Sequence, residues 1–146
     1  MKNFSILVVD DEEDFTETLV KRLSKRKMNA TGVQSGEDAL EILKKNSIDV
    51  VILDIKMPGG MDGIETLREI KKMQPLCEVL LLTGHGSMET SIEGMKLGAF
   101  DYLLKPVKLE ELFPKLAEAF QRKDAQDQKI RGAQVTKLLR HGRLIP

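Results

Sequence analysis

Two hydrophobic patterns alternate along the chain. Short wholly apolar blocks are followed by longer stretches in which apolar residues recur every three or four positions. A wholly apolar block is typical of a strand buried on both faces, and a three- or four-residue spacing is typical of an amphipathic helix. The pattern predicts strands at residues 6–9, 50–53 and 79–82, a weaker strand at 29–33 that we expect at an edge, and a fifth at 101–104.

A predicted helix follows each strand. Ser35 is the expected N-cap of the second helix, with Asp38 three residues further on. Pro114 falls early in the fifth helix and is tolerable there only within about the first turn. Alternating strands and helices of this kind predict a (βα)₅ unit, a parallel sheet covered by helices on both faces. The apolar stripes are Phe15/Leu19/Leu23, Leu40/Leu43, Ile64/Leu67/Ile70, Ile92/Met95 and Leu109/Leu112/Leu116/Phe120.

Reactive side chains stand where the predicted strands end. Asp10 and Asp11 follow the first strand, Asp54 the third, Thr83 the fourth and Lys105 the fifth. Ligands of open parallel sheets bind outside the carboxyl ends of the strands, so we expect these side chains to converge.

Hard oxygen ligands without histidine or cysteine suit Mg²⁺, which would offset the mutual repulsion of the carboxylates. A carboxylate can also act as a nucleophile toward phosphorus, with a metal, a hydroxyl and an ammonium neutralising the transferring group. Singly, Asp10 and Asp11 would be a helix cap and Asp54 a turn residue. The convergence of all these groups on one rim favours the functional interpretation.

Four segments carry a resemblance to a known family. "ILVVDDE", "VILDIKMPGGMDG", "LTGHG" and "GAFDYLLKPV" resemble the response-regulator receiver domain of bacterial two-component systems, over about residues 4–122. The resemblance implies a flavodoxin-like, doubly wound sheet with strand order 2-1-3-4-5. It also implies a signalling switch that accepts a phosphoryl group from a sensor histidine kinase or a phosphotransfer protein. Such a domain catalyses only its own phosphorylation and dephosphorylation.

The resemblance assigns roles around the metal. Asp54 matches the phosphoacceptor, Asp11 the direct metal ligand and Asp10 the water-mediated ligand. The backbone carbonyl of Lys56 would complete the protein ligands of Mg²⁺, for which Mn²⁺ is a possible substitute. The side chain of Lys56 is expected to shield the phosphoryl group and lengthen its lifetime, with His85 flanking the same path.

Further roles concern the switch. Thr83 and Lys105 match the pair that binds phosphoryl oxygens, and Tyr102 matches an aromatic residue that turns inward with Thr83. Lys105–Pro106 matches the family's cis peptide bond. The expected output surface is formed by the fourth helix, the fifth strand and the fifth helix, where a downstream protein or a second copy would bind. The loop from Pro58 to Gly63 carries one residue more than the family pattern and is expected to be widened.

Three other interpretations stay open. An aspartyl-nucleophile phosphatase would need a second Asp two residues after Asp54, where this chain has Lys56. A flavin mononucleotide binder would need a phosphate loop where "DDEED" stands, and this acidic run would repel phosphate. A receiver-like interaction module would act without phosphorylation.

Composition sets the outer limits. The chain has 146 residues, a single cysteine and no long apolar run, which predicts one domain without disulfides or a membrane span and a cytoplasmic location. Residues 1–120 carry a net charge of −5 and residues 121–146 a net charge of +5.

The basic end of the chain is set apart from the receiver-like part. We expect residues 1–122 to form a receiver domain similar to those that precede ATPase-type transcription activators. Residues 123–146 would form a basic tail, either a frayed helical extension or disordered. A docking segment is the sharper interpretation, with Ile130, Val135, Leu138 and Leu139 as anchors. Nucleic-acid binding by this chain alone is not expected, because the tail lacks aromatic residues and a fold of its own.

Overall fold

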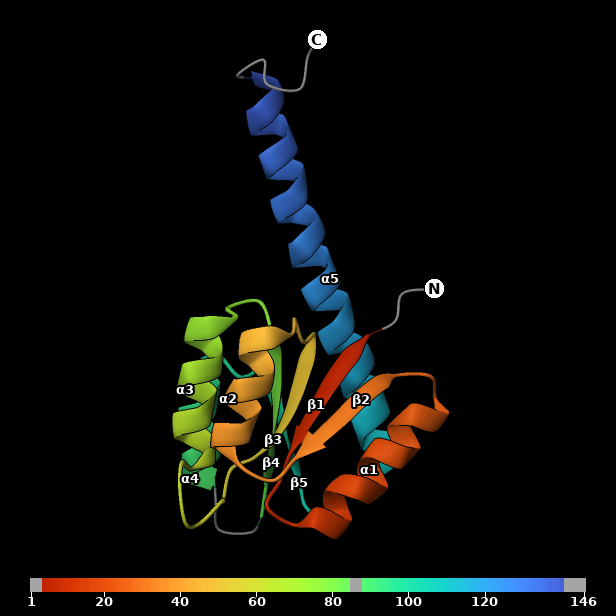
Figure 1. Cartoon of the computed structure of the whole chain (residues 1–146), viewed down its shortest axis with the longest axis vertical. Coiled ribbons are helices and arrows are strands. Elements are labelled where there is room, and N and C mark those ends of the chain that lie inside the picture. Colours follow the sequence, from red (N-terminus) through yellow and green to blue (C-terminus); the bar gives the residue numbers. More distant parts are fainter. Residues whose placement is uncertain (1–3, 85–87, 141–146) are drawn as a thin grey trace.

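The computed structural model describes residues 4–84 and 88–140. Within them strands and helices alternate as the sequence predicts (Figure 1). The strands are β1 (Ser5–Val9), β2 (Asn29–Val33), β3 (Val50–Asp54), β4 (Glu78–Thr83) and β5 (Asp101–Leu104). The helices are α1 (Glu13–Lys25), α2 (Gly36–Lys45), α3 (Gly63–Met73), α4 (Met88–Lys96) and α5 (Leu109–Arg140).

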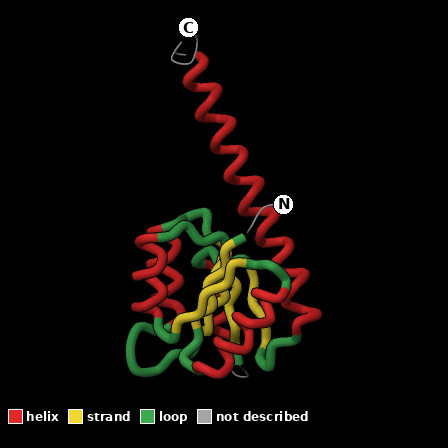
Figure 2. Tube along the Cα trace, turned by 45° about the vertical axis from the view of Figure 1, so that its right-hand side comes forward, coloured by secondary structure: helices red, strands yellow, loops and turns green. Residues whose placement is uncertain are grey.

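All strand pairs are parallel, in the order β2-β1-β3-β4-β5. The strands lie together in the middle of the molecule with helices around them (Figure 2). The predicted flavodoxin-like sheet is therefore confirmed. The register sets Val9 beside Leu53, so the residues that follow β1 come close to Asp54 at the end of β3. The strand order reverses between these two strands, which is where open sheets of this kind bind their ligands.

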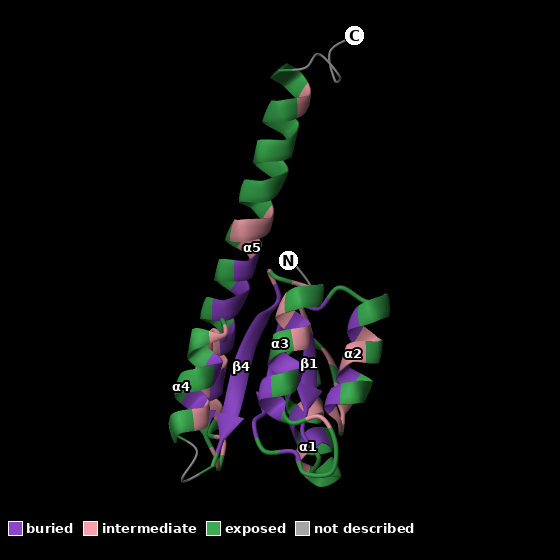
Figure 3. Ribbon diagram, turned by 90° about the vertical axis from the view of Figure 1, so that its left-hand side faces the viewer, coloured by how far each residue is buried: buried purple, intermediate pink, exposed green. Residues whose placement is uncertain are grey.

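The sheet separates two hydrophobic cores. Helices α1 and α5 cover one face, and α2, α3 and α4 lie on the other (Figures 1 and 3). Side chains of β1 alternate between them, because successive residues of a strand point to opposite faces. Leu7 and Val9 enter the core under α2 and α3, while Ile6 and Val8 enter the core under α1 and α5.

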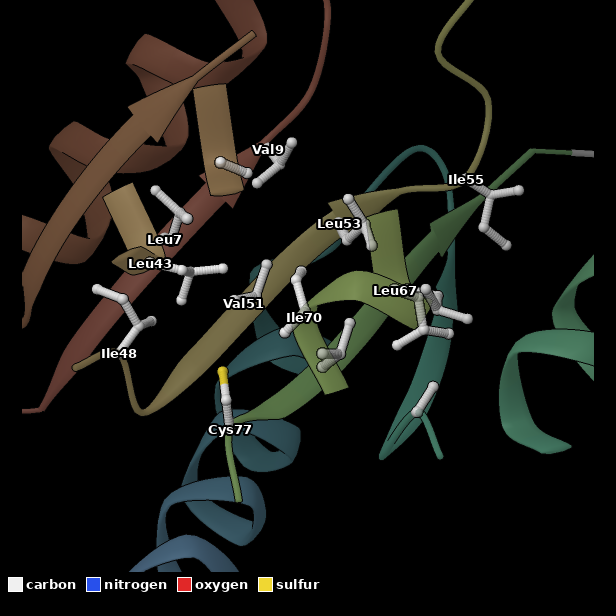
Figure 4. Close-up of a cluster of buried hydrophobic side chains, with 14 of the residues drawn as sticks. Leu7, Val9, Leu43, Ile48, Val51, Leu53, Ile55, Leu67, Ile70 and Cys77 are labelled. Carbon is white, nitrogen blue, oxygen red and sulfur yellow. The ribbon is translucent and has the colours of Figure 1, made fainter. Parts of the chain in front are cut away.

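In the core under α2 and α3, the apolar residues of the strands pack against the apolar residues of the helices. Val51 and Leu53 of β3 lie beside Leu67 and Ile70 of α3 (Figure 4). These four side chains have no exposed surface. Each fully buried aliphatic side chain contributes about 1.5–3 kcal/mol of transfer free energy. The lone cysteine, Cys77, is buried in the same core, and burial raises the pKa of its thiol to about 12.

Two local predictions are also confirmed. The hydroxyl of Ser35 caps α2 by accepting a hydrogen bond from the backbone N–H of Asp38 at 3.1 Å. Strand β2 is only half buried and pairs with β1 alone in the sheet, as expected of an edge strand.

The fifth helix differs from the prediction in the position of its proline. Pro114 is the sixth residue of α5 and so lies in the second turn rather than the first. The helix also continues without interruption to Arg140, giving 32 residues, and its far end projects away from the sheet (Figure 1). At about 1.5 Å per residue, α5 is about 48 Å long. No helix in the described ranges is long and apolar enough to cross a membrane.

Candidate functional site

Three carboxylates meet at the carboxyl ends of β1 and β3. Oxygen atoms of Asp10, Asp11 and Asp54 all lie within 4.8 Å of one another. Asp10 is fully buried and Asp54 is 5% exposed, whereas Asp11 faces solvent. The cluster is therefore closed on the side of the protein and open on one other side, which is the form of a site that takes a ligand from solution. The sequence predicts this convergence, and the structure confirms it.

Backbone groups hold the two buried carboxylates. Oδ1 of Asp10 accepts a hydrogen bond from the N–H of Glu12 at 3.0 Å, and Oδ1 of Asp54 accepts one from the N–H of Lys56 at 3.3 Å. The hydroxyl of Thr16 donates to the carbonyl of Asp10 at 3.1 Å, which ties the first turn of α1 to the end of β1. Thr16 is buried, and it is a site residue that the sequence analysis missed. Its spacing from Leu19 and Leu23, three and seven residues, was the available signal.

Lys105 reaches the cluster from the end of β5. Its Nζ lies 2.8 Å from Oδ2 of Asp10 and 3.5 Å from Oδ2 of Asp54. Glu12 Oε1 is 3.9 Å away, and the ring of Phe15 has its centroid 5.0 Å from the ammonium. The ammonium thus offsets part of the negative charge of the cluster, and Phe15 covers it as a cation–π partner that the sequence analysis did not identify.

Electrostatics of the cluster disfavour three ionised carboxylates. Burial, followed by the charge of Asp10, raises the pKa of Asp54 to about 6, although Lys105 acts against the rise. Burial by itself would lower the pKa of Lys105, but its hydrogen bond to Asp10 and the charge of Asp54 outweigh burial, so that pKa is raised. A divalent cation would relieve the repulsion, and the donors are hard oxygens. The residues present therefore fit a divalent metal ion.

Thr83 and Tyr102 lie on the neighbouring strands. Thr83 ends β4, is 2% exposed, and donates its hydroxyl to the carbonyl of Gly84 at 3.3 Å. Tyr102 is partly buried against the core under α2 and α3. The two residues are on adjacent, paired strands. The peptide bond between Lys105 and Pro106 is cis, as the family resemblance implies.

Lys56 and His85 were both expected beside the phosphoryl group. Lys56 follows β3 closely, and its side chain is exposed. His85 lies outside the described residues. The lifetime roles of both residues stay predictions.

The loop after Lys56 carries the additional residue. Gly59 has a φ of +92°, and the N–H of Met61 donates to Oε2 of Glu37 at 3.2 Å, which links the loop to α2. Gly63 begins α3 so close to β3 that a Cβ there would lie 2.5 Å from the carbonyl oxygen of Asp54. The residues expected to hold the metal, Asp10, Asp11, Asp54 and Lys56, all precede the loop, and the close approach of Gly63 fixes where the loop must end.

Comparison with known proteins supports the same interpretation. The family model of the response regulator receiver domain matches residues 6–117. The matched residues make up more than half of the chain, and the chain therefore belongs to this family.

Relatives and solved structures agree with this membership. The chain is 40% identical over 117 residues to the transcriptional regulatory protein ZraR of Escherichia coli K12, covering 80% of this chain and 26% of ZraR. It is 38% identical over 113 residues to a putative NtrX-like response regulator of Rickettsia bellii, covering 77% of this chain and 24% of that protein. A receiver domain from Clostridium thermocellum has a TM-score of 0.80 and 40% identity, covering 84% and 98% of the two chains. The chain spans about a quarter of the length of the curated relatives it matches.

Proposed function

We propose that the protein is a phosphorylation-dependent signalling switch that accepts a phosphoryl group on Asp54. The donor would be a sensor histidine kinase or a phosphotransfer protein, and Mg²⁺ would be required. The observation that carries this proposal is the position of Asp54, buried at the rim of the sheet, within 4.8 Å of two further carboxylates and 3.5 Å from an ammonium. Family membership supports the choice of donor.

The chemistry follows from the charges of the site. One carboxylate oxygen of Asp54 would attack phosphorus, forming an acyl phosphate as the donor leaves. A bound Mg²⁺ would supply positive charge for the phosphoryl oxygens, held by Asp10, Asp11 and the carbonyl of Lys56. Lys105 is already at the cluster and would neutralise a second phosphoryl oxygen. The hydroxyl of Thr83 would turn from the carbonyl of Gly84 to the third oxygen.

The output surface is proposed to lie on α4, β5 and α5. Large apolar side chains are exposed on the first two of these elements, at Met88, Ile92 and Met95 of α4 and Leu104 of β5. Exposed apolar patches of this kind mark contact sites. Movement of Thr83 would be relayed by Tyr102 to this surface, where a downstream protein or a second copy of the chain would bind. The cytoplasmic location stays a prediction.

The decisive experiment measures the phosphoryl adduct directly. The protein is incubated with acetyl phosphate, with and without Mg²⁺, and its intact mass is recorded. We expect one phosphoryl group with Mg²⁺, little without it, and none in Asp54→Ala. Absence of the adduct, or an equal adduct in Asp54→Ala, would refute the assignment and favour an interaction module that acts without phosphorylation. Sustained turnover of a generic phosphate ester would instead favour the phosphatase interpretation.

The switch is tested separately. Beryllofluoride, a mimic of the phosphoryl group, is added with Mg²⁺, and backbone amide shifts are followed by NMR. We expect shifts that extend from Asp54 through Tyr102 to α4. Shifts confined to the residues around the carboxylates would mean that the output surface does not respond.

A further inference from the structure

Charged side chains are buried where α5 leaves the sheet. Lys123 is 8% exposed and Glu78, the first residue of β4, is 2% exposed. Glu78 begins its strand, so this site lies at the opposite edge of the sheet from the carboxylates that follow the strand ends. Lysine and glutamate are almost never buried to this extent unless they are paired.

Lys123 is paired with two carboxylates. Its Nζ lies 3.3 Å from Oδ1 of Asp49, just before β3, and 2.6 Å from Oδ2 of Asp127, one turn further along α5. Asp49 also accepts a hydrogen bond from the N–H of Ser5 at 2.9 Å, which joins the pair to the start of β1. Burial by itself would lower the pKa of Lys123, but Asp127 and Asp49 outweigh burial and raise it. Lys123 therefore stays a cation despite its burial.

Arg122 makes a second attachment. Its Nε lies 3.0 Å from Oε2 of Glu78, and its guanidinium carbon lies 5.6 Å from the centroid of the Phe100 ring. Nζ of Lys71, on α3, is 3.9 Å from the other oxygen of Glu78. Glu78 is thus held between cations from two helices.

The two attachments act in different directions. Arg122 and Lys123 are consecutive, so their side chains leave the helix about 100° apart. Asp49 lies just before β3 and Glu78 is the first residue of β4, so the two helix side chains are held near the starts of two different strands. A helix held at one side can still rotate about that point, whereas attachment at two angles resists both rotation and tilt. The stacked rings of Phe4 and Phe120, with centroids 4.0 Å apart, add a contact one turn earlier.

The part of α5 that follows these contacts does not pack against the sheet. Residues 128–137 are all exposed, and the helix projects alone (Figures 1 and 3). An isolated helix shorter than about 12–15 residues is marginal in water. The 13 residues from 128 to 140 therefore depend on the part of α5 that is fixed to the sheet.

We propose that Arg122 and Lys123, with Glu78, Asp49 and Asp127, form a helix latch that fixes the direction in which α5 leaves the sheet. Residues 128–140 then continue as one rigid arm with the domain. The arm holds Ile130, Val135 and Leu139 at a constant distance and orientation from the sheet. The latch is independent of phosphorylation and of the metal site.

The test compares the order of the arm in two matched double variants. Arg122→Gln with Lys123→Met removes both latch cations and keeps unbranched side chains that are compatible with a helix. Lys129→Met with Arg131→Gln makes the same chemical change at two exposed positions of the arm. For each protein, ¹⁵N relaxation gives order parameters, and residual dipolar couplings show whether the arm and the sheet share one alignment tensor.

We expect a shared tensor and order parameters near about 0.85 throughout α5 in the unaltered protein and in the exposed-site variant. In the variant that lacks the latch cations, the order parameters of the sheet stay unchanged. Those of residues 128–140 fall below about 0.6, and these residues no longer share the alignment tensor of the sheet. An arm that stays ordered and aligned in the latch variant, or one that is already independent in the unaltered protein, refutes the proposal. If that variant does not fold, the same measurements are made on Arg122→Gln with Asp127→Asn. This second variant keeps the Lys123–Asp49 pair, so we expect a smaller drop in the order parameters of the arm.

Discussion

The ammonium of Lys105 donates a hydrogen bond to the buried carboxylate of Asp10 at 2.8 Å, across 95 residues of sequence. The pair joins the end of β1, which Asp10 follows, to the end of β5, which Lys105 follows. It also means that a cation is already in place before any ligand arrives, so the charge that a phosphoryl group brings would meet a prearranged partner.

Removing this cation tests its role. Lys105→Met should slow phosphorylation by acetyl phosphate by about 10²–10³-fold, because one preorganised donor to the transferring group is lost. The rate is measured by intact mass over time at saturating Mg²⁺. Lys108→Met is the control, since Lys108 is exposed on the same segment, and it should leave the rate unchanged. Equal rates in the two variants would show that Lys105 does not take part.

The raised pKa of Asp54 makes stability depend on pH. Its folded pKa of about 6 lies above the unfolded value of about 4, so the folded protein binds the proton more tightly. Without metal, stability should therefore be greatest below about pH 4 as far as this group is concerned, and should fall as pH rises toward 6. Asp54→Asn should remove this dependence and stabilise the metal-free protein at pH 7.5 by about 1–3 kcal/mol, measured by urea unfolding. A destabilised variant would mean that the attraction of Lys105 dominates.

The metal site predicts a second pH effect. Asp11→Asn should weaken Mg²⁺ binding by about tenfold or more, because one of three charges is lost, whereas Glu13→Gln should have little effect. In the unaltered protein the affinity should decline below about pH 6, where Asp54 must release a proton for the metal to bind. Titration of amide shifts with MgCl₂ at pH 5, 6 and 7.5 measures both effects. An affinity independent of pH would place Asp54 outside the metal site.

Two glycines provide a matched test of packing. A Cβ at Gly63 would lie 2.5 Å from both the carbonyl oxygen of Asp54 and the Cα of Ile55, whereas a Cβ at Gly132 would meet nothing within 4 Å. Gly63→Ala should therefore cost about 1–3 kcal/mol of unfolding free energy. Gly132→Ala should instead stabilise the helix locally by about 0.5–1 kcal/mol and so increase the helix content. Urea unfolding measures the first and circular dichroism the second, and a neutral Gly63→Ala would show that α3 can move away from β3.

The exposed side chain of Lys56 gives a prediction about lifetime. An acyl phosphate decays when water attacks in line with the leaving carboxylate, and a long ammonium-tipped chain near that path would slow the attack. Lys56→Asn should then increase the rate of dephosphorylation several-fold at fixed Mg²⁺ and pH. The decay is followed by the loss of the mass adduct, with His85→Ala measured in parallel. An unchanged or slower decay in Lys56→Asn would mean that Lys56 is not the shield.

Strands and site residues were predictable from sequence for a common reason. The apolar blocks around Ile52 and Leu80 identify buried strands, and a parallel sheet brings all strand ends to one edge. Asp10, Asp54 and Lys105 could therefore be assigned to one place without knowledge of any side-chain position. Such an argument depends only on which residue follows a strand.

What could not be predicted depends on contacts between side chains distant in sequence. Lys123 reads as an exposed lysine of a polar tail, and only the fold brings Asp49 within reach of it. Glu78 reads as a polar residue outside the strand 79–82, yet it begins β4 and is buried against Arg122.

The alternation of Ile6, Leu7, Val8 and Val9 between two cores has a consequence for how the domain unfolds. Each central strand contributes side chains to both cores, so loosening the side chains on one face removes support from those on the other. We therefore expect the two cores to unfold together, so that the domain from β1 to the start of α5 unfolds as one cooperative unit. A substitution such as Leu7→Ala, made under α2, should weaken hydrogen-exchange protection under α1 as strongly as in its own core.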